Sequence, residues 1–425
     1  MITNNTIILL TSNNFDFYYL KKIINELLIQ KVNFQIWNLE FLKKKQNKSY
    51  QKITTKNHYL KKKNLKIFKY KNIENFIRKI KSSKFLYFLS LEPLEDNNLY
   101  HDKEFLKKIN IRFGIIQKGD DYYANFLNKK FLDLNKYNPT LFSISRYKYK
   151  RSLNFLKNKI KINLFRQLKY QKKIFTGYFF TKNYSSKNKN KNLIIYFPYY
   201  SNLVLGNNQF SNALAFYKIY EKKKTSESIF KYILKKMFFI ILILKSFRSI
   251  RIFLCYNEKK ILKEIYNFCR KFNFKLVIKS RKKNQLNNYH FQYSDKVIND
   301  DHVKQDPNYL EELLPKTFLS ICYSSQAIYD SIFNNVPVLN INNLNYSLIK
   351  RDTELIDQSK KSEFNYPDII TLLNEKEFLK KILKLNPKDI FFSKNQRNKY
   401  LKKILNLKNN IFGEKKIIKE ILKFK

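Results

Sequence analysis

The sequence predicts an α/β protein with two Rossmann-like lobes, each built on a parallel sheet, and a helical C-terminal extension. Two long stretches carry this prediction, because short apolar runs typical of strands alternate there with segments of helical spacing. The chain has 425 residues, which fits two domains of ordinary size. Its hydrophobic content of 44%, with 38 Phe and 31 Tyr, supplies the apolar surface that two cores require.

In the N-terminal part, strand-like and helical segments alternate almost from the first residue. Strands are expected at 6–10, 34–37, 66–68, 85–89 and 113–116, and helices at 16–28 and 73–80. The run that opens the chain lacks the basic start and cleavage site of a signal peptide, so it is interpreted as a strand. Residues 125–165 are basic and periodic but contain no clear strand.

A second α/β series begins near residue 193. Its expected strands are 193–197, 251–256, 275–279, 317–322 and the run after Pro337, and its expected helices are 226–247, 258–271, 307–314 and the segment that follows Ser325.

Composition shifts suggest where the domains begin and end. We expect an N-terminal lobe over 1–165, a linker over 166–190, a C-terminal lobe over 191–370 and a basic helical segment over 371–425. The linker precedes a polar run of Lys, Asn and Ser that cannot bury much surface.

The charge balance favours anionic partners. The chain has 85 Lys and Arg against 33 Asp and Glu, a net charge of +52. Nucleic acid, an anionic membrane face and phosphorylated substrates are the candidate classes. Abundant Lys, Asn, Ile, Phe and Tyr with only 5 Gly also match the bias of an AT-rich genome, which is an alternative origin for the excess.

Cysteine and histidine patterns predict no metal and no disulfide framework. The three cysteines form no Cys-x-x-Cys pair, the four histidines are scattered, and no Asp-x-Asp is present. A reducing cytoplasm is the expected location. The most apolar run, 237–244, has eight residues between lysines, far fewer than the ~20 that cross a bilayer as a helix. We expect it in a buried helix, with a face dipping into the membrane interface as the alternative.

The most informative motif is a strand, a hydroxyl-rich turn at Ser324-Ser325, a helix, a stop at Asn335 and a second strand after Pro337. A helix that begins after such a turn directs backbone N–H groups beyond the carboxyl end of the strand, an arrangement that suits a phosphate. An ordinary capped helix of any Rossmann-like domain is the alternative interpretation.

This segment resembles the donor-binding turn of GT-B glycosyltransferases, above all surface-carbohydrate (capsule and LPS) biosynthesis proteins and CDP-glycerol glycerophosphotransferase-like enzymes. The resemblance implies that Ser324, Ser325 and Gln326 bind the phosphates of an activated donor and that Asp330 contacts its ribose or sugar. Asp330 stands where the family has Glu, and Asn335 where it has Gly. Asn is the next-best residue for the left-handed helix cap that this position requires.

Two further fragments resemble the same families. Lys279 and Arg281 follow a strand, where open α/β sheets bind ligands, and could clamp a phosphate; a basic surface turn is the alternative. The run that begins at Leu193 resembles the opening of the donor lobe, so Ser201 and Asn202 in its loop are expected to meet the donor.

In the N-terminal lobe, the segment from Gly114 to Asp121 is placed like the Gln-His-Gly loop of related enzymes, with Lys118 in place of the histidine. An enzyme of this kind needs a base for the proton of the acceptor hydroxyl, and Asp120 or Asp121 could supply it. Rival carboxylates follow the strand that ends at residue 89.

Taken together, these residues predict a metal-independent transferase without a cofactor. It would move a sugar or polyol-phosphate group from a nucleotide-sugar or CDP-polyol donor to a glycan or lipid-linked acceptor. The expected location is the cytoplasm, with an anionic membrane surface at the inner face of the plasma membrane as a candidate partner. A nucleic-acid-binding protein is an alternative, although no RNP or helix-turn-helix signature is present. A catalytically inactive GT-B relative is another.

Overall fold

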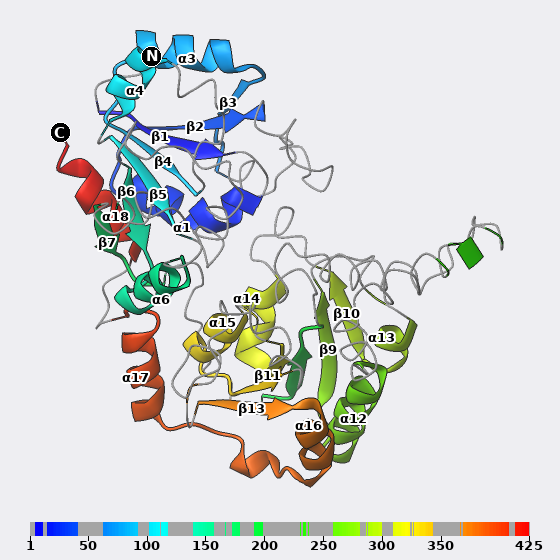
Figure 1. The fold of residues 1–425 in the computed structure, drawn as a ribbon. Coiled ribbons are helices and arrows are strands. Elements are labelled where there is room, and N and C mark those ends of the chain that lie inside the picture. The colour runs from blue at the N-terminus through cyan, green and yellow to red at the C-terminus, as the bar shows by residue number, and fades with distance from the viewer. Residues whose placement is uncertain are drawn as a thin grey trace. The chain divides into compact units, whose positions relative to one another are not determined.

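The structure is a computed structural model in which the chain forms two compact units (Figure 1). Unit 1 groups Met1–Lys182 and His302–Asp306 with Leu401–Lys425, and unit 2 groups Asn183–Asp301 with Pro307–Tyr400. The residues that the structure describes are 5–11, 15–40, 63–91, 102–110, 112–117, 139–156, 166, 172–178, 191–198, 230, 233–234, 237, 258–280, 286, 288–299, 309–323, 325, 327–342, 366, 369–407 and 413–424.

The described part of unit 1 contains a seven-stranded sheet whose neighbours are all paired in parallel, in the order β3-β2-β1-β4-β5-β6-β7. Its strands are β1 (Ile7–Thr11), β2 (Phe34–Leu39), β3 (Ile67–Tyr70), β4 (Tyr87–Ser90), β5 (Phe113–Ile116), β6 (Thr140–Ser143) and β7 (Lys173–Phe175). Its helices are α1 (Phe15–Ile29), α3 (Ile73–Ser82), α4 (Lys103–Ile109), α6 (Arg146–Leu156) and α18 (Gly413–Leu422).

Unit 2 has a six-stranded parallel sheet among its described residues, in the order β10-β9-β8-β11-β12-β13. Its strands are β8 (Leu193–Tyr196), β9 (Lys275–Ser280), β10 (Lys296–Asn299), β11 (Thr317–Cys322), β12 (Val338–Asn342) and β13 (Ile370–Asn374). The helical segments are α12 (Glu258–Lys271), α13 (Asn288–Gln292), α14 (Tyr309–Leu313), η5 (Leu314–Lys316), α15 (Ala327–Phe333), α16 (Glu375–Lys381), η7 (Ile382–Lys384) and η8 (Pro387–Asp389), followed by α17 (Lys394–Lys403).

The expected α/β class with parallel sheets is confirmed, and several elements match closely. The helix predicted at 258–271 and the strand predicted at 317–322 have the bounds of α12 and β11. These segments combine clear periodicity with apolar side chains that become buried. The predicted strand 251–256 and most of the predicted helix 226–247 lie outside the described residues, although residues 230, 233, 234 and 237 are helical.

Other elements were not predicted. The strands β6 and β7 occur where no strand was expected, and β7 lies within the segment interpreted as the linker. In unit 2, α13 and β10 were missed, and residues 370–374 form a strand where a helical segment was expected to begin. All of these elements are three to five residues long, too short for a period to emerge, and their strand pairing is decided by neighbours distant in sequence.

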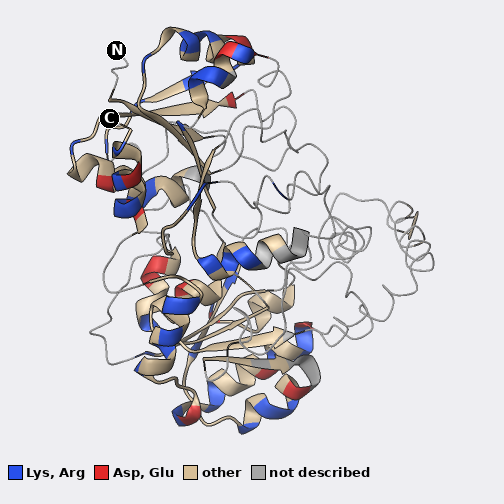
Figure 2. Ribbon diagram, turned by 60° about the vertical axis from the view of Figure 1, so that its left-hand side comes forward, with Lys and Arg blue, Asp and Glu red and all other residues tan. Residues whose placement is uncertain are grey.

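Lysine and arginine are spread over the described helices of both units (Figure 2). In unit 1, for example, α3 keeps Ile73, Phe76 and Ile80 buried and carries Lys79 and Lys81 in its last turn. Basic residues such as these lie on the solvent side of α3, where their charge raises the potential around the protein, although Lys148 and Lys279 are buried.

The core of unit 1 is aromatic. Trp37 on β2 is fully buried, and its ring lies 6.1 Å from those of Phe76 and Phe88, both at steep interplanar angles. Such edge contacts add to the transfer free energy of burying large rings. Gly114 on β5 fits the same packing, since a Cβ there would lie 2.5 Å from a ring carbon of Phe142.

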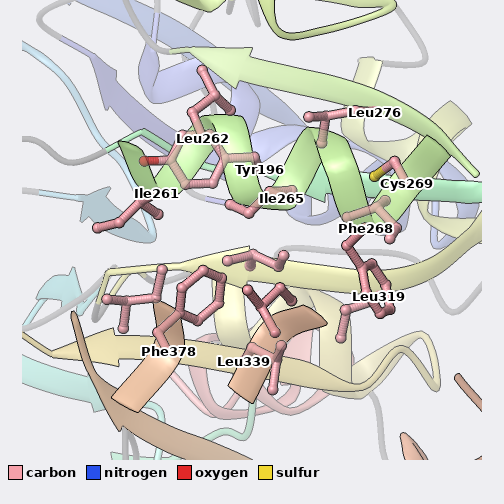
Figure 3. Close-up of a cluster of buried hydrophobic side chains, with 14 of the residues drawn as sticks. Tyr196, Ile261, Leu262, Ile265, Phe268, Cys269, Leu276, Leu319, Leu339 and Phe378 are labelled. Atoms are coloured by element: carbon pink, nitrogen blue, oxygen red, sulfur yellow. The ribbon is translucent and has the colours of Figure 1, made fainter. Parts of the chain in front are cut away.

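The core of unit 2 forms between α12 and the sheet (Figure 3). The helix buries Ile261, Leu262, Ile265 and Phe268 completely, and these positions follow the period of an α-helix. They pack with Tyr196 of β8 and with side chains of β9, β11 and β12. Each fully buried apolar side chain of this size contributes about 1.5–3 kcal/mol, so the helix and sheet stabilise each other.

The C-terminal residues pack in unit 1. The backbone N–H of Tyr178 donates to the carbonyl of Leu405 at 2.9 Å, and Lys416 donates to the carbonyl of Phe175 at 2.8 Å. Gly177 has a φ of +87°, and a Cβ there would lie 3.1 Å from the carbonyl oxygen of Asn406. The close approach of the two segments therefore requires glycine.

A buried carboxyl lies where α18 packs on α1. Glu414 is 9% exposed, and burial raises the pKa of its carboxyl, with Glu26 of α1 adding to the rise and Lys22 opposing it. The folded state thus holds the proton more tightly than the unfolded state. Stability is therefore lost as pH rises above 4.5, the ordinary pKa of the group.

We predict that Glu414→Gln stabilises the protein at pH 7 by about 1 kcal/mol, because a neutral amide replaces a carboxylate that is costly to bury. The gain should shrink toward pH 4, where the wild-type carboxyl is protonated. Urea unfolding at both pH values measures it. Glu420→Gln on the same helix is the control, because the carboxylate of Glu420 already pairs with Lys423 at 2.7 Å, and equal effects of the two variants would contradict the prediction.

Candidate functional site

In the sheet of unit 2, the direction in which the chain adds strands reverses between β8 and β11. From β8 the chain proceeds outward to β9 and β10, and it then returns to the other side with β11, β12 and β13. Open parallel sheets bind ligands at such a switch point, beyond the carboxyl ends of the strands. Tyr196 ends β8 and Tyr323 follows β11, and their ring centroids lie 6.3 Å apart. The hydroxyl-rich turn of the sequence follows Tyr323, so it begins at the switch point.

Ser325 initiates α15. Its carbonyl accepts the N–H of Ile328 at 3.1 Å, and its side-chain oxygen accepts the N–H of Ala327 at 3.3 Å. The hydroxyl oxygen thereby caps the helix, while the hydroxyl proton can be donated to an acceptor. The predicted strand and helix are confirmed as β11 and α15, and Ser325 lies between them.

The other end of α15 closes with Asn335 in the left-handed conformation, at a φ of +58°. The N–H of Asn335 donates to Ile332 and that of Val336 donates to Ser331, at 3.1 and 2.9 Å. The expectation that Asn335 replaces glycine as a left-handed cap is therefore confirmed. Such a cap satisfies the last carbonyls of the helix before the chain enters β12.

Two cations from distant segments bind the same end of α15. Arg397 on α17 donates to the carbonyls of Ile332 and Phe333 at 2.9 and 2.6 Å. Lys191 donates to the carbonyl of Asn335 at 2.9 Å. Burial lowers the pKa of both side chains, and the neighbouring Arg397 lowers that of Lys191 further. Positive charge at the negative end of the helix fixes α15 in place.

Successive side chains of a strand point to opposite faces of the sheet, and this alternation shows which strand residues face α15. Ser320 on β11 hydrogen-bonds Ser331 of α15 at 2.8 Å, so this face of β11 lies under α15. Ser320 on β11 pairs with Ile195 on β8, and Ile195 pairs with Val277 on β9. Side chains of paired residues point to the same face of a sheet, so Val277 also lies on the α15 side. Lys279, two residues beyond Val277, shares this face.

Lys279 and Asp330 are both buried, at 5% and 7% exposure, on the side of the sheet that carries the turn. A contact of these two residues with a donor stays a prediction. The remaining predicted site residues lie outside the described part of the chain: Asp120, Asp121, Ser201, Asn202, Arg281, Ser324 and Gln326.

Cys322, the last residue of β11, is not suited to nucleophilic chemistry. Burial raises the pKa of its thiol to about 12, although a hydrogen bond from the backbone of Ser325 opposes the rise. The thiolate is the reactive form of cysteine, so this side chain acts as a small core residue beside the turn. No three His, Cys, Asp or Glu side chains gather as metal ligands within the described residues.

A buried polar network occupies the opposite layer and was not predicted. Glu258, the first residue of α12, accepts hydrogen bonds from the hydroxyls of Tyr196 at 3.1 Å and Tyr289 at 2.9 Å. His290 lies with its Nε2 3.6 Å from the Glu258 carboxylate. Burial, and then the charge of Glu258, raise the pKa of Tyr196 far above its usual value, so this phenol remains a donor.

The network joins the end of β8 to the start of α12 and to α13, beside Tyr323 at the switch point. An acidic residue at a helix start is common on protein surfaces, so the sequence offered no sign that Glu258 is buried. The only signal in the sequence was that Glu258 follows the strand predicted at 251–256, which would place it at the carboxyl edge of the sheet.

We predict that Tyr289→Phe destabilises unit 2 by about 1.5–3 kcal/mol, because the Glu258 carboxylate would lose a buried donor. The matched control is Tyr293→Phe, since the hydroxyl of Tyr293, in the turn after α13, takes part in no described hydrogen bond. Urea unfolding monitored by circular dichroism measures both variants. Equal stability of the two would show that Tyr289 does not support the carboxylate.

Comparisons with known proteins agree with this architecture. No family model matches the chain, and no curated protein matches its sequence. Two solved structures of the wall teichoic acid polymerase TagF, one a variant soaked with CDPG, align over 99% of this chain and 89% of theirs. Both have a TM-score of 0.50, at 12% and 11% sequence identity. A UDP-GlcNAc 2-epimerase from Methanocaldococcus jannaschii covers 99% of both chains at 14% identity and a TM-score of 0.47.

The fold assignment rests on the polymerase structures and on the two parallel sheets, since the epimerase overlay is looser. At these identities the likeness concerns the fold alone. The chain therefore has the GT-B-like fold with two α/β lobes that the sequence predicted.

Proposed function

We propose that this protein is a transferase that moves a sugar or polyol-phosphate group from a nucleotide-activated donor to a glycan or lipid-linked acceptor. The observation that carries the proposal is the position of Ser325, which opens α15 directly beyond β11 at the switch point of a parallel sheet. The GT-B-like fold supports it, because one of the polymerase structures that share this fold was soaked with CDPG.

In this proposal the donor phosphates lie at the turn before α15. The hydroxyl of Ser325 and the backbone N–H groups of the turn would donate to phosphate oxygens, and the positive end of the helix would favour their charge. Arg397 and Lys191 hold the far end of α15 and so keep the turn in register with β11. Lys279, on the same face, adds a positive potential beneath the site.

Catalysis needs a leaving phosphate that is stabilised and an acceptor hydroxyl that is deprotonated. The turn would perform the first task by electrostatic stabilisation. We assign the second to a carboxylate of unit 1, with Asp120 and Asp121 as the candidates from the sequence. The proposed reaction requires no metal ion, because helix N–H groups and basic side chains take the role of a divalent cation.

Ser325→Asp should abolish donor binding, because a carboxylate would face the phosphates, and the fold should remain. The control is Ser393→Asp, since Ser393 caps α17 in a similar way by accepting the N–H of Gln396 at 3.1 Å. Thermal shift against CMP, CDP, UDP, GDP and their sugar or glycerol conjugates, with and without EDTA, measures binding. The expected shift for one nucleotide is on the order of several degrees at 100 times Kd, and EDTA should leave it unchanged.

Retention of the nucleotide shift in Ser325→Asp would place the site elsewhere. Loss of the shift with EDTA would overturn the metal-independent mechanism. If no nucleotide shifts the wild-type protein and a salt-sensitive affinity for RNA or DNA appears instead, the nucleic-acid alternative would replace the transferase.

An anionic membrane surface is the partner that we propose for the acceptor side of the reaction. The helical residues Phe230, Ile233, Leu234 and Met237 are 72%, 50%, 49% and 56% exposed, and their spacing places them on one helix face. Lysines lie between them in the sequence. Exposed apolar side chains beside lysines suit an anionic lipid interface. No helix among the described residues is long and apolar enough to cross a bilayer.

Phe230→Ser should reduce binding to phosphatidylglycerol vesicles severalfold, because a large apolar side chain would leave the lipid interface. The matched control is Phe391→Ser, since Phe391 is 75% exposed in another part of the chain. Co-sedimentation at physiological salt, with phosphatidylcholine vesicles for comparison, gives the affinity. Equal binding by the two variants would argue that another surface makes the contact.

A further inference from the structure

A second polar site lies in unit 1 and goes beyond the proposed donor site. Gln117 directly follows β5, and its backbone N–H donates to the carbonyl of Phe142 on β6 at 2.9 Å. Its side-chain oxygen accepts the hydroxyl of Ser143, the last residue of β6, at 2.6 Å. Both residues are almost fully buried, at 1% and 0% exposure. The amide is therefore fixed at the carboxyl edge of the sheet.

The structure places the amide oxygen of Gln117 against the hydroxyl of Ser143. The oxygen of Gln117 is the acceptor for that hydroxyl, so its Nε2 is directed away from Ser143 and carries two donor hydrogens. This nitrogen is buried and has no hydrogen-bond partner among the described residues. A buried donor without an acceptor costs about 1–3 kcal/mol, and such groups in native proteins commonly mark the place of a ligand or an ion.

The N-terminus of α6 begins at the same edge. Ser145, two residues beyond Ser143, accepts the N–H of Lys148 at 3.1 Å with its side chain and so caps the helix. The helix is 11 residues long and starts at Arg146, which is exposed. Residues 117 and 143–146 thus place the buried amide, the positive end of α6 and Arg146 at the carboxyl edge of β5 and β6, and the guanidinium of Arg146 lies 5.9 Å from the ring centroid of Phe175.

All three groups favour the same ligand chemistry. The helix terminus and Arg146 attract negative charge, and the Gln117 amide offers hydrogens but no available acceptor. Ser143 ends β6, and Gln117 and Thr176 directly follow β5 and β7; none of the three carries a negative charge. A neutral sugar would need acceptors as well as donors, whereas a phosphoryl group presents oxygens only.

We propose that unit 1 binds a phosphoryl group at the carboxyl edge of β5 and β6, held by the Gln117 side-chain amide, Arg146 and the N-terminus of α6. The ligand class is a phosphate monoester or diester, either in a water-soluble molecule or in a lipid headgroup. Binding here is separate from the donor site, which lies in unit 2.

The test uses the full-length Ser325→Asp variant, in which the proposed donor site is disabled, so phosphate binding reports on unit 1 whether or not the proposed function holds. Isothermal titration with inorganic phosphate, against chloride at equal ionic strength, gives the affinity. We expect binding to weaken roughly tenfold when Gln117→Met is added, because one hydrogen bond to a charged oxygen is lost. Gln30→Met is the matched control, since its amide already donates to Glu26 at 2.7 Å.

Arg146→Gln and Lys150→Gln extend the test to a pair of exposed cations on the same helix. Arg146→Gln should weaken phosphate binding severalfold, whereas Lys150→Gln, beyond the first turn, should change it little. This pair of variants tests phosphate binding at the N-terminus of α6 even if Gln117→Met fails to fold. Unchanged affinity in both Gln117→Met and Arg146→Gln, or no phosphate binding at physiological salt, would overturn the proposal.

The source of the phosphoryl group is resolved by two further probes on the same variant. Glycerol phosphate in solution should compete with inorganic phosphate if the ligand is water-soluble. Vesicles of phosphatidylglycerol should do so, in a manner that depends on Gln117, if the ligand is a lipid headgroup. Competition by neither probe would contradict a monoester or diester ligand.

Discussion

Parallel strand pairing is the constraint on which the rest of this structure depends. Both sheets are parallel throughout their described strands, so the carboxyl ends of all strands in a sheet meet at one edge. The strands are largely apolar, and many polar side chains therefore lie at or beyond that edge, although Ser320 within β11 is also buried. Ser325 in unit 2 and Gln117 in unit 1 both follow from this geometry, although neither is near the other in sequence.

Buried polar groups have different kinds of partners in the two units. In unit 2 the carboxylate of Glu258 receives two tyrosine hydroxyls, and the carbonyls at the end of α15 receive Arg397 and Lys191. These contacts hold the frame around the switch point. In unit 1 the amide of Gln117 is oriented by Ser143 but keeps an unsatisfied donor. The hydrogen bonds that Glu258 accepts stabilise the frame, whereas the buried donor of Gln117 favours a ligand with acceptor oxygens.

Charge acts on a longer scale than these contacts. A net charge of +52 costs the compact state self-repulsion, and lysine and arginine are spread over the described helices of both units. Such a field attracts phosphates of nucleotides, lipids and nucleic acids alike. Specificity must therefore come from groups of fixed geometry, such as the turn at Ser325, and not from the overall charge.

The sequence by itself determined the fold class, long elements such as α12 and the cap at Asn335, because helical periodicity, apolar strands and helix caps are local signals. The 11-residue helix α6 was not assigned from the sequence. Short strands such as β7 and β10 were not predicted, since three or four residues are too few to show a hydrophobic period. Only the tertiary structure decided that Glu258 is buried among tyrosines, that the C-terminal helix α18 packs on α1, and that Gln117 lacks an acceptor. Each of these depends on contacts between residues far apart in the chain, which strand order and packing establish and local sequence does not encode.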